Sequence, residues 1–286
     1  MTEFKYLKEL LSTATGTEGL LLIPKKIYDA LIDEAEKVLI PRSEAAYIIT
    51  GAAIPGSSID LNLITPNTLK IRVIGEGASA PIDQVAYTSL NFKPVKYGVS
   101  LRITREMLED AQWNLLENNL RIIGRRFAEN ETNLIITALD NAGNTVAGGA
   151  AITIANITRA MQYLEDSDYT PTTLFIGQEV LNDLRNIDTF VEASRVGNTE
   201  MLTKGFLGNI YGLNCLRFST NAAPSSAYSK YAYVTDKNHA YAIVEKRPIT
   251  VERFEMPVYD MSAAVCTQRI VVGYVRTSAI AKITTA

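Results

Sequence analysis

The sequence contains very little histidine and cysteine. Of its 286 residues, one is a histidine, His239, and two are cysteines, Cys215 and Cys266. A zinc site needs several of these side chains at close spacing, and here they lie far apart along the chain. Two cysteines are also too few for a disulfide framework, which suits a reducing compartment. We therefore expect no metal site and no disulfide-stabilised scaffold.

A basic excess and a long apolar run are lacking as well. The formal net charge is −3 at pH 7, so the charge balance does not point to a tightly held nucleic acid. No apolar stretch approaches the roughly 18–20 residues that are needed to span a membrane. Residues 1–5 include an acid and do not lead into the apolar core of a signal peptide. These absences predict a soluble protein made in the cytoplasm, without a membrane partner.

Motifs for catalysis and cofactor binding are also missing. No Gly-x-Ser-x-Gly elbow occurs, and Gly75-Glu76-Gly77 lacks the third glycine and the following helix of a dinucleotide fingerprint. A Ser-His-Asp triad would have to use His239, which stands in a segment typical of a turn between strands. We therefore expect no catalytic residue and no cofactor. A serine hydrolase that uses His239 is the remote alternative.

The composition is that of an ordinary globular protein, with 47% hydrophobic and 21% charged residues. Its clearest pattern begins at residues 95–103, where apolar and other residues alternate, which predicts a half-buried strand. Thr104 can cap a helix that follows. Apolar residues then recur at three- and four-residue steps up to Ala138, which predicts a helix of about 25 residues and roughly 38 Å. Glu131 falls on this apolar stripe, where a buried carboxylate needs a partner.

The same helix carries charges at four-residue spacing. Glu117, Arg121, Arg125 and Glu129 recur on one stripe, so that each glutamate can pair with an arginine. This pattern is typical of a solvated helix face. Arg126 adds a further basic side chain, and a basic face toward a polyanion is the alternative interpretation.

Residues 45–92 indicate strands and turns that form a long hairpin. Apolar and basic residues alternate over 69–73, which predicts one strand, and a second extended run covers 84–92. Residues 75–81 between them would form a wide polar tip. Because a lone hairpin is only marginally stable in water, we expect it to lie on another part of the protein or on a neighbour.

The rest of the chain mixes helices and strands. A helix, a buried strand and a second helix are predicted within residues 157–186, which indicates an α/β unit. Residues 190–208 are polar and irregular, as in a surface loop. Later strands are predicted at 213–218, 231–234, 241–245, 249–254 and 264–275.

Taken in order, seven segments resemble the major capsid proteins of tailed viruses, bacteriophage or archaeal, which have the Hong Kong 97 fold. The segments are VIGEG at 73–77, FKPVK at 92–96, ITREMLED at 103–110, FAENE at 127–131, GQEVLNDL at 177–184, LGNIYG at 207–212 and QRIVVG at 268–273. Each motif is weak by itself, but their order and spacing together are specific. The similarity extends from about residue 69 to the C-terminus.

The resemblance implies an α+β, Hong Kong 97-like fold. Such a fold has an N-terminal arm, an extended E-loop β-hairpin, a P-domain with a long spine helix and a β-sheet, and an α/β A-domain. The implied parts are the N-terminal arm and helix at 1–44, the E-loop hairpin region at 45–95, the P-domain spine helix at 96–149, the A-domain at 150–235, and the P-domain strands at 236–286.

The resemblance also implies which residues matter for assembly, since the E-loop of the family lies across a neighbouring subunit. The residues implied at this intersubunit contact are Gly75, Glu76, Gly77 and Pro81. The residues singled out on the spine helix are Glu117, Arg121, Arg125 and Glu131.

The implied function is that of a structural capsid protein, not an enzyme. It would self-assemble into pentamers and hexamers of an icosahedral shell around double-stranded DNA, in a virion whose parts are made in the host cytoplasm. Portal and scaffold proteins are further expected partners. Because only residues 1–44 precede the hairpin region, we expect assembly to use a separate scaffold or none.

An encapsulin, which uses the same fold as a compartment around enzyme cargo, is the main alternative. The N-terminal helix that holds the cargo peptide in that family is not evident in residues 1–20. The slight negative charge of the chain suits a wall around DNA, because strong non-specific attraction would impede packaging.

Overall fold

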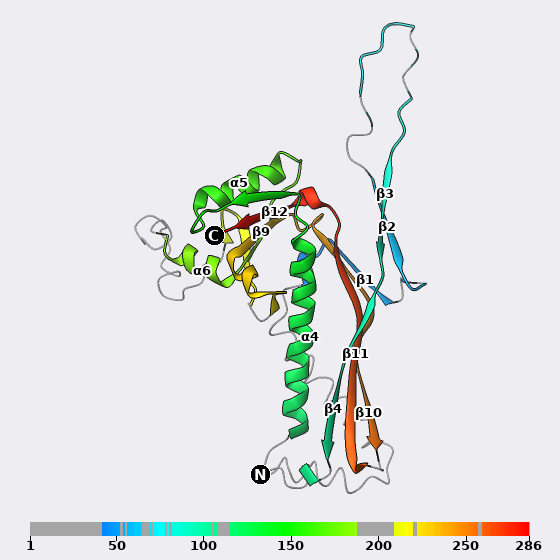
Figure 1. The fold of residues 1–286 in the computed structure, drawn as a ribbon. Helices are drawn as coiled ribbons and strands as arrows, with labels where there is room; N and C mark the ends of the chain where they lie inside the picture. The colour runs from blue at the N-terminus through cyan, green and yellow to red at the C-terminus, as the bar shows by residue number, and fades with distance from the viewer. Residues whose placement is uncertain are drawn as a thin grey trace.

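The computed structural model describes residues 42–51, 54, 56–64, 69, 71–77, 79, 82–104, 106–107, 115–187, 209–219, 222–256 and 259–285. These residues form a four-stranded sheet, a six-stranded sheet, a long helix and a projecting two-stranded hairpin (Figure 1). The strand order is β1-β10-β11-β4 in the first sheet and β5-β12-β9-β6-β8-β7 in the second.

The helices and 3-10 turns are η1 (Arg42–Glu44), α4 (Leu115–Leu139), α5 (Ile154–Glu165), α6 (Gln178–Arg185), η4 (Ser226–Lys230) and η6 (Thr277–Ala279). The strands are β1 (Tyr47–Thr50), β2 (Ile59–Ile64), β3 (Tyr87–Phe92), β4 (Val95–Thr104), β5 (Asn144–Ala147), β6 (Thr173–Ile176), β7 (Asn209–Ile210), β8 (Leu213–Arg217), β9 (Tyr231–Thr235), β10 (Tyr241–Met256), β11 (Met261–Tyr274) and β12 (Ile280–Thr284). No helix in this part of the chain is both long and apolar enough to cross a membrane.

The four-stranded sheet and α4 make an elongated unit, in which the helix runs beside the long strands (Figure 1). The apolar stripe of α4, represented by Leu120, Ile123 and Phe127, packs on Ile249 and Cys266 of the sheet. The helix is 25 residues long. The sequence-based predictions of a strand at 95–103 and of a helix of about this length are both confirmed.

The predicted helix start at Thr104 is supported in part. The Thr104 hydroxyl accepts a hydrogen bond from the Met107 N–H at 3.3 Å, which is the geometry of a helix cap. The long helix itself begins at Leu115. The local capping signal therefore predicted a helical turn correctly, but did not locate the beginning of α4.

The two sheets meet around the C-terminal half of α4. Ile135, Ile136 and Leu139 are fully buried there and share one core with Phe175 of β6 and Tyr241 of β10. The Phe175 and Tyr241 rings meet edge to face, with centroids 6.3 Å apart. One helix thus contributes to a core that it shares with both sheets.

The six-stranded sheet buries its other face under α5 and α6. Ile157 and Leu164 of α5 and Leu184 of α6 pack with Leu174 and Val234 of the sheet, and all five are fully buried. The helix–strand–helix order predicted from the sequence is confirmed by α5, β6 and α6.

The chain places β12 in the six-stranded sheet, whereas the sequence-based division assigned residues 236–286 together to the P-domain. β12 pairs parallel with β5 and antiparallel with β9. Both β5 and β12 therefore belong to the six-stranded sheet and not to the unit formed by α4 and the four-stranded sheet. The apolar residues Ile280 and Ile283 are fully buried in this position. Periodicity predicts that a strand is buried, but it cannot identify the sheet that the strand joins.

Asp140 directly follows α4 and ties the helix to the six-stranded sheet. Its carboxylate accepts hydrogen bonds from Lys282 Nζ at 2.5 Å, from the Tyr228 hydroxyl at 3.1 Å and from the Tyr233 hydroxyl at 3.3 Å. Lys282 Nζ also lies 3.9 Å from the centroid of the Tyr231 ring. One carboxylate at the end of α4 thus accepts hydrogen bonds from β12, η4 and β9.

We expect Asp140→Ala to lower the free energy of unfolding by about 2–3 kcal/mol, because the Lys282 ammonium and two phenols lose their shared acceptor. Urea denaturation followed by circular dichroism measures this change. Asp166→Ala removes an exposed carboxylate and should cost less than about 0.5 kcal/mol. Equal losses in the two variants would contradict the role of Asp140.

Among the described residues, the strand pairing of the hairpin lies near its base. β2 and β3 are antiparallel, with Ile59 opposite Phe92 and Ile64 opposite Tyr87. The prediction of a strand at 69–73 is wrong for the subunit alone, since the described residues of that segment are in no strand. Alternation of apolar side chains favours extended backbone, but a strand also needs a hydrogen-bonding neighbour, and no described residue of the subunit pairs with this segment as a strand.

Candidate functional site

The hairpin beyond β2 and β3 exposes large apolar side chains. The relative exposures of Ile71, Val73 and Ile82 are 105%, 103% and 93%. This part of the chain is the cyan segment that projects away from both sheets at the top of Figure 1. Soluble proteins rarely leave a contiguous group of such side chains in water unless the surface contacts a partner. The projecting segment is therefore the leading candidate for an assembly contact.

The predicted E-loop residues lie at the end of this segment. Gly75, Glu76 and Gly77 are exposed, and Gly77 has φ of +79°, a backbone conformation that favours glycine. Pro81 lies outside the described residues. Arg72 Nη2 and Asp83 Oδ1 form an ion pair at 3.2 Å across the hairpin. The structure therefore brings the three described residues together in one turn, and their contact with a neighbour stays a prediction.

The root of the hairpin is held against the four-stranded sheet. Phe92, at the end of β3, is only 5% exposed. A Cβ atom at Gly273 of β11 would lie 2.6 Å from Cε1 of this ring, so the glycine leaves the space that the ring occupies. Arg276 Nη2 also donates a hydrogen bond to the Ile64 carbonyl at 2.7 Å. The hairpin thus projects from a fixed, apolar base.

The charged residues predicted on the spine helix include an exposed group. Arg125 Nε donates to Glu129 Oε1 at 3.2 Å, and Arg126 Nη1 donates to Glu129 Oε2 at 2.7 Å. Both arginines are exposed, as is Arg121. Glu117 lies in α4, but its side chain is outside the described part of the structure. The pairing of Arg125 with Glu129 was predicted from the four-residue spacing. Glu129 itself is only 7% exposed, so the solvated face predicted for this stripe is confirmed for the arginines and not for Glu129.

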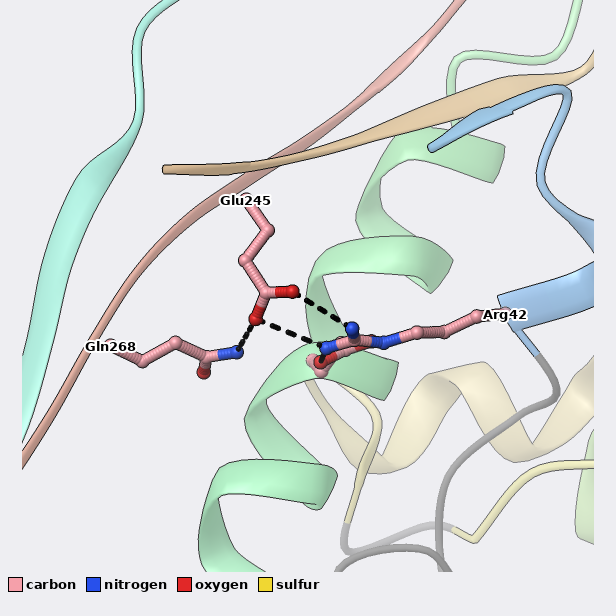
Figure 2. Close-up of polar contacts among 4 residues, drawn as sticks. Arg42, Glu245 and Gln268 are labelled. Atoms are coloured by element: carbon pink, nitrogen blue, oxygen red, sulfur yellow. Dashed lines mark hydrogen bonds and ion pairs between the residues drawn. The ribbon is translucent and has the colours of Figure 1, made fainter. Parts of the chain in front are cut away.

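Glu131, by contrast, is buried on the apolar side of α4 and is only 2% exposed. Arg42 donates to both of its carboxylate oxygens, each at 2.8 Å. The same guanidinium donates to Glu245 of β10 at 2.9 and 3.3 Å. Gln268 Nε2 of β11 donates to Glu245 Oε1 at 3.1 Å (Figure 2). The requirement for a partner at Glu131 was correctly predicted from the sequence.

Arg42 itself was missed by sequence reasoning. It stands 89 positions before Glu131, and no local pattern connects the two residues. The hydrogen bond to Glu131 raises the pKa of the Arg42 guanidinium further above its usual value, against the lowering effect of burial. The position of Glu131 on an apolar stripe was the one available signal. It indicated that the carboxylate needs a partner, but it did not identify Arg42 as that partner.

The remote alternative of a serine hydrolase required a nucleophile beside His239. His239 Nδ1 lies 2.6 Å from Asp236 Oδ2, and the His239 ring lies 5.2 Å from the ring of Tyr169. Among the described residues, no hydroxyl group forms a hydrogen bond with the His239 ring. The described part of the chain therefore contains an Asp-His pair without the third member of a triad.

Neither cysteine forms a disulfide bond. Both are free thiols, and burial raises the pKa of Cys215 and of Cys266 to about 11. Each thiol therefore stays protonated at neutral pH. Within the ranges that the structure describes, no group of three or more His, Cys, Asp or Glu side chains could hold a metal ion.

Comparison with known proteins gives one family and many structural likenesses. A family model described as phage capsid protein matches residues 87–283. No curated protein matches the chain. The mature capsid of bacteriophage PhiM1 is 12% identical, with a TM-score of 0.68 over 87% of each chain. A structure from Mycobacterium phage Che8 is 14% identical, with a TM-score of 0.67 over 87% of this chain and 90% of that one.

A virus-like particle from Pyrococcus furiosus is also similar in structure. It is 13% identical, with a TM-score of 0.60 over 91% of this chain and 98% of that one. At such low identities, the likenesses establish a shared fold. The family match covers more than half of the chain.

Proposed function

Because the chain belongs to the phage capsid protein family, we propose that it assembles as pentamers and hexamers into an icosahedral shell that encloses double-stranded DNA. The Hong Kong 97-like α+β fold expected from the sequence is confirmed by the structural likenesses. The chain is a major capsid protein, a structural component of the virion. Family and fold point to a role that depends on contacts between copies and not on catalysis.

The observation that carries this proposal is the exposed, apolar hairpin. Transfer of a valine or isoleucine side chain from water into a contact contributes about 1.5–3 kcal/mol, and Ile71, Val73 and Ile82 are almost wholly exposed. A neighbouring copy is the partner that would cover them in every subunit of a shell. Gly75, Glu76, Gly77 and Pro81 would then lie at this intersubunit contact.

The same proposal assigns a part of the capsid fold to each segment of the chain. The spine helix would carry Glu117, Arg121 and Arg125 on its charged face, with Glu131 on its buried side. The proposed parts are the N-terminal arm and helix at 1–44, the E-loop hairpin region at 45–95, the P-domain at 96–149 and 236–286, and the A-domain at 150–235. The pairing of β12 with both β5 and β9 supports a boundary that moves β5 and β12 to the A-domain.

The shell would enclose DNA without binding it tightly. The net charge of −3 provides little non-specific attraction to phosphates, so packaged DNA could move along the inner wall. A portal protein, and a separate scaffold protein if assembly uses one, would be further partners, and synthesis would take place in the host cytoplasm.

Expression of the full chain followed by negative-stain electron microscopy tests the proposal. We expect closed particles of uniform diameter that sediment far ahead of the subunit. Particles recovered from infected cells should contain nuclease-protected double-stranded DNA. A co-purifying enzyme in place of DNA would favour the encapsulin alternative, and a protein that stays monomeric at every concentration and salt would refute shell assembly.

A further inference from the structure

Residues 42–50, which comprise η1 and β1, form a strap that joins the main parts of the subunit. Glu44 accepts a hydrogen bond from the Thr173 hydroxyl of β6 at 2.5 Å. The Ala46 N–H donates to the Tyr241 carbonyl at 2.8 Å, and β1 pairs parallel with β10. Through Arg42, the strap also binds Glu131 of α4. The strap therefore contacts the helix and both sheets, and it precedes the hairpin strands β2 and β3 in the chain.

The strap encloses an excess of negative charge. Glu131 of α4 and Glu245 of β10 have side chains that are only 3% and 8% exposed, and Glu44 is 9% exposed. One guanidinium, that of Arg42, pairs with two of these carboxylates, Glu131 and Glu245, while Glu44 accepts a hydrogen bond from Thr173. The Arg42 Nη2 atom donates to Glu131 and to Glu245 at once. The guanidinium therefore bridges the two carboxylates.

No other described side chain in this cluster can take over the role of Arg42. Gln268 is fully buried and donates one hydrogen bond to Glu245, while its Oε1 atom has no partner. The Tyr241 hydroxyl is also buried without a partner, in the field of Glu44 and Glu131, and burial raises its pKa well above the usual range. Neither group carries positive charge, so the loss of the guanidinium would leave buried like charges uncompensated.

The Arg42 side chain is more exposed to solvent than the two carboxylates that it binds. It is 33% exposed, compared with 3% for Glu131 and 8% for Glu245. The Arg42 side chain is therefore partly in contact with solvent, and Figure 2 shows it extending toward Glu245 beside α4.

We propose that Arg42 is a charge latch that closes the contact between α4 and β10. With the strap seated, Arg42 allows Glu131 and Glu245 to lie together, and the helix is held against the sheet. With the strap withdrawn, the two carboxylates repel each other, and the helix and sheet separate at this point. The position of the chain around residue 42 thereby controls the packing of α4, independently of shell assembly.

The test uses the purified full chain with Arg42→Ala. We expect its melting temperature to fall by about 5–10 °C, because a buried pair of carboxylates loses its partner. Added guanidinium chloride at about 20 mM, far below denaturing concentrations, should restore part of this loss by occupying the vacated site. Sodium chloride at the same concentration should not, and the wild-type protein should respond to neither.

A second variant separates charge from packing. Arg42→Ala combined with Glu245→Gln removes one of the two like charges and should recover at least half of the lost melting temperature. Arg72→Ala breaks an exposed ion pair with Asp83 and serves as the matched control, with an expected shift below about 2 °C.

Amide hydrogen exchange locates the change. Arg42→Ala should speed exchange in α4 around Glu131 and in β10 around Glu245, and should leave α5 as in the wild type. The charge latch would be refuted if neither guanidinium nor Glu245→Gln restored stability, or if Arg42→Ala behaved like Arg72→Ala. Because the readouts are made on dilute protein, below the concentration at which particles form, failure of the latch and failure of shell assembly are distinguishable.

Discussion

A subunit in which Ile71, Val73 and Ile82 are all replaced by serine is expected to fold normally and to form no particles. These side chains are almost wholly exposed in the described part of the subunit, at 93–105%, so their loss should leave the melting temperature unchanged. In a shell, each would contribute about 1.5–3 kcal/mol by burial. Even after the costs of ordering, the concentration needed for assembly should rise at least about a hundredfold.

Light scattering and negative-stain microscopy over a concentration series measure this effect. The matched control is Ile71→Val, Val73→Ile and Ile82→Val, which retains apolar side chains at all three positions and should assemble. If the serine variant assembled at the wild-type concentration, the exposed hairpin would not be the contact between copies. If its melting temperature fell, the segment would have a role within the subunit.

Phe92→Ala is expected to lower the free energy of unfolding by about 3–5 kcal/mol, the range for loss of a large buried aromatic side chain. Phe92 is 5% exposed and holds the base of the hairpin on β11. We therefore expect assembly to weaken together with stability. Urea denaturation measures the first effect, and faster hydrogen exchange in β2 and β3 shows that the hairpin has loosened.

Gly273→Ala tests the same contact from the other side. A Cβ atom at this position would lie 2.6 Å from the Phe92 ring, so the single variant should cost about 1–3 kcal/mol by overpacking. In the Phe92→Ala background the ring is absent, and the added methyl group should cost much less. Additive effects in this double-mutant cycle would show that the two residues do not restrain each other.

The limits of sequence reasoning are clear at the hairpin and at Arg42. Alternation over residues 69–73 predicted extended backbone, but the described residues of this segment pair with no described strand of the subunit, so the predicted strand is wrong there. At Glu131, the helical stripe predicted burial and a partner, and both are observed. The identity of the partner depended on which distant segment folds against α4, and no local pattern encodes that.

The sequence by itself determined the local elements and the resemblance to a family. Side-chain periodicity reports which face of a strand or helix is apolar, and this was enough for β4, for the length of α4 and for the order α5, β6, α6. Only the tertiary structure decided that β12 joins the six-stranded sheet, that Gly273 makes room for Phe92, and that Arg42 joins Glu131 to Glu245. Such contacts join residues far apart in the chain, and they form because the whole fold brings their elements together.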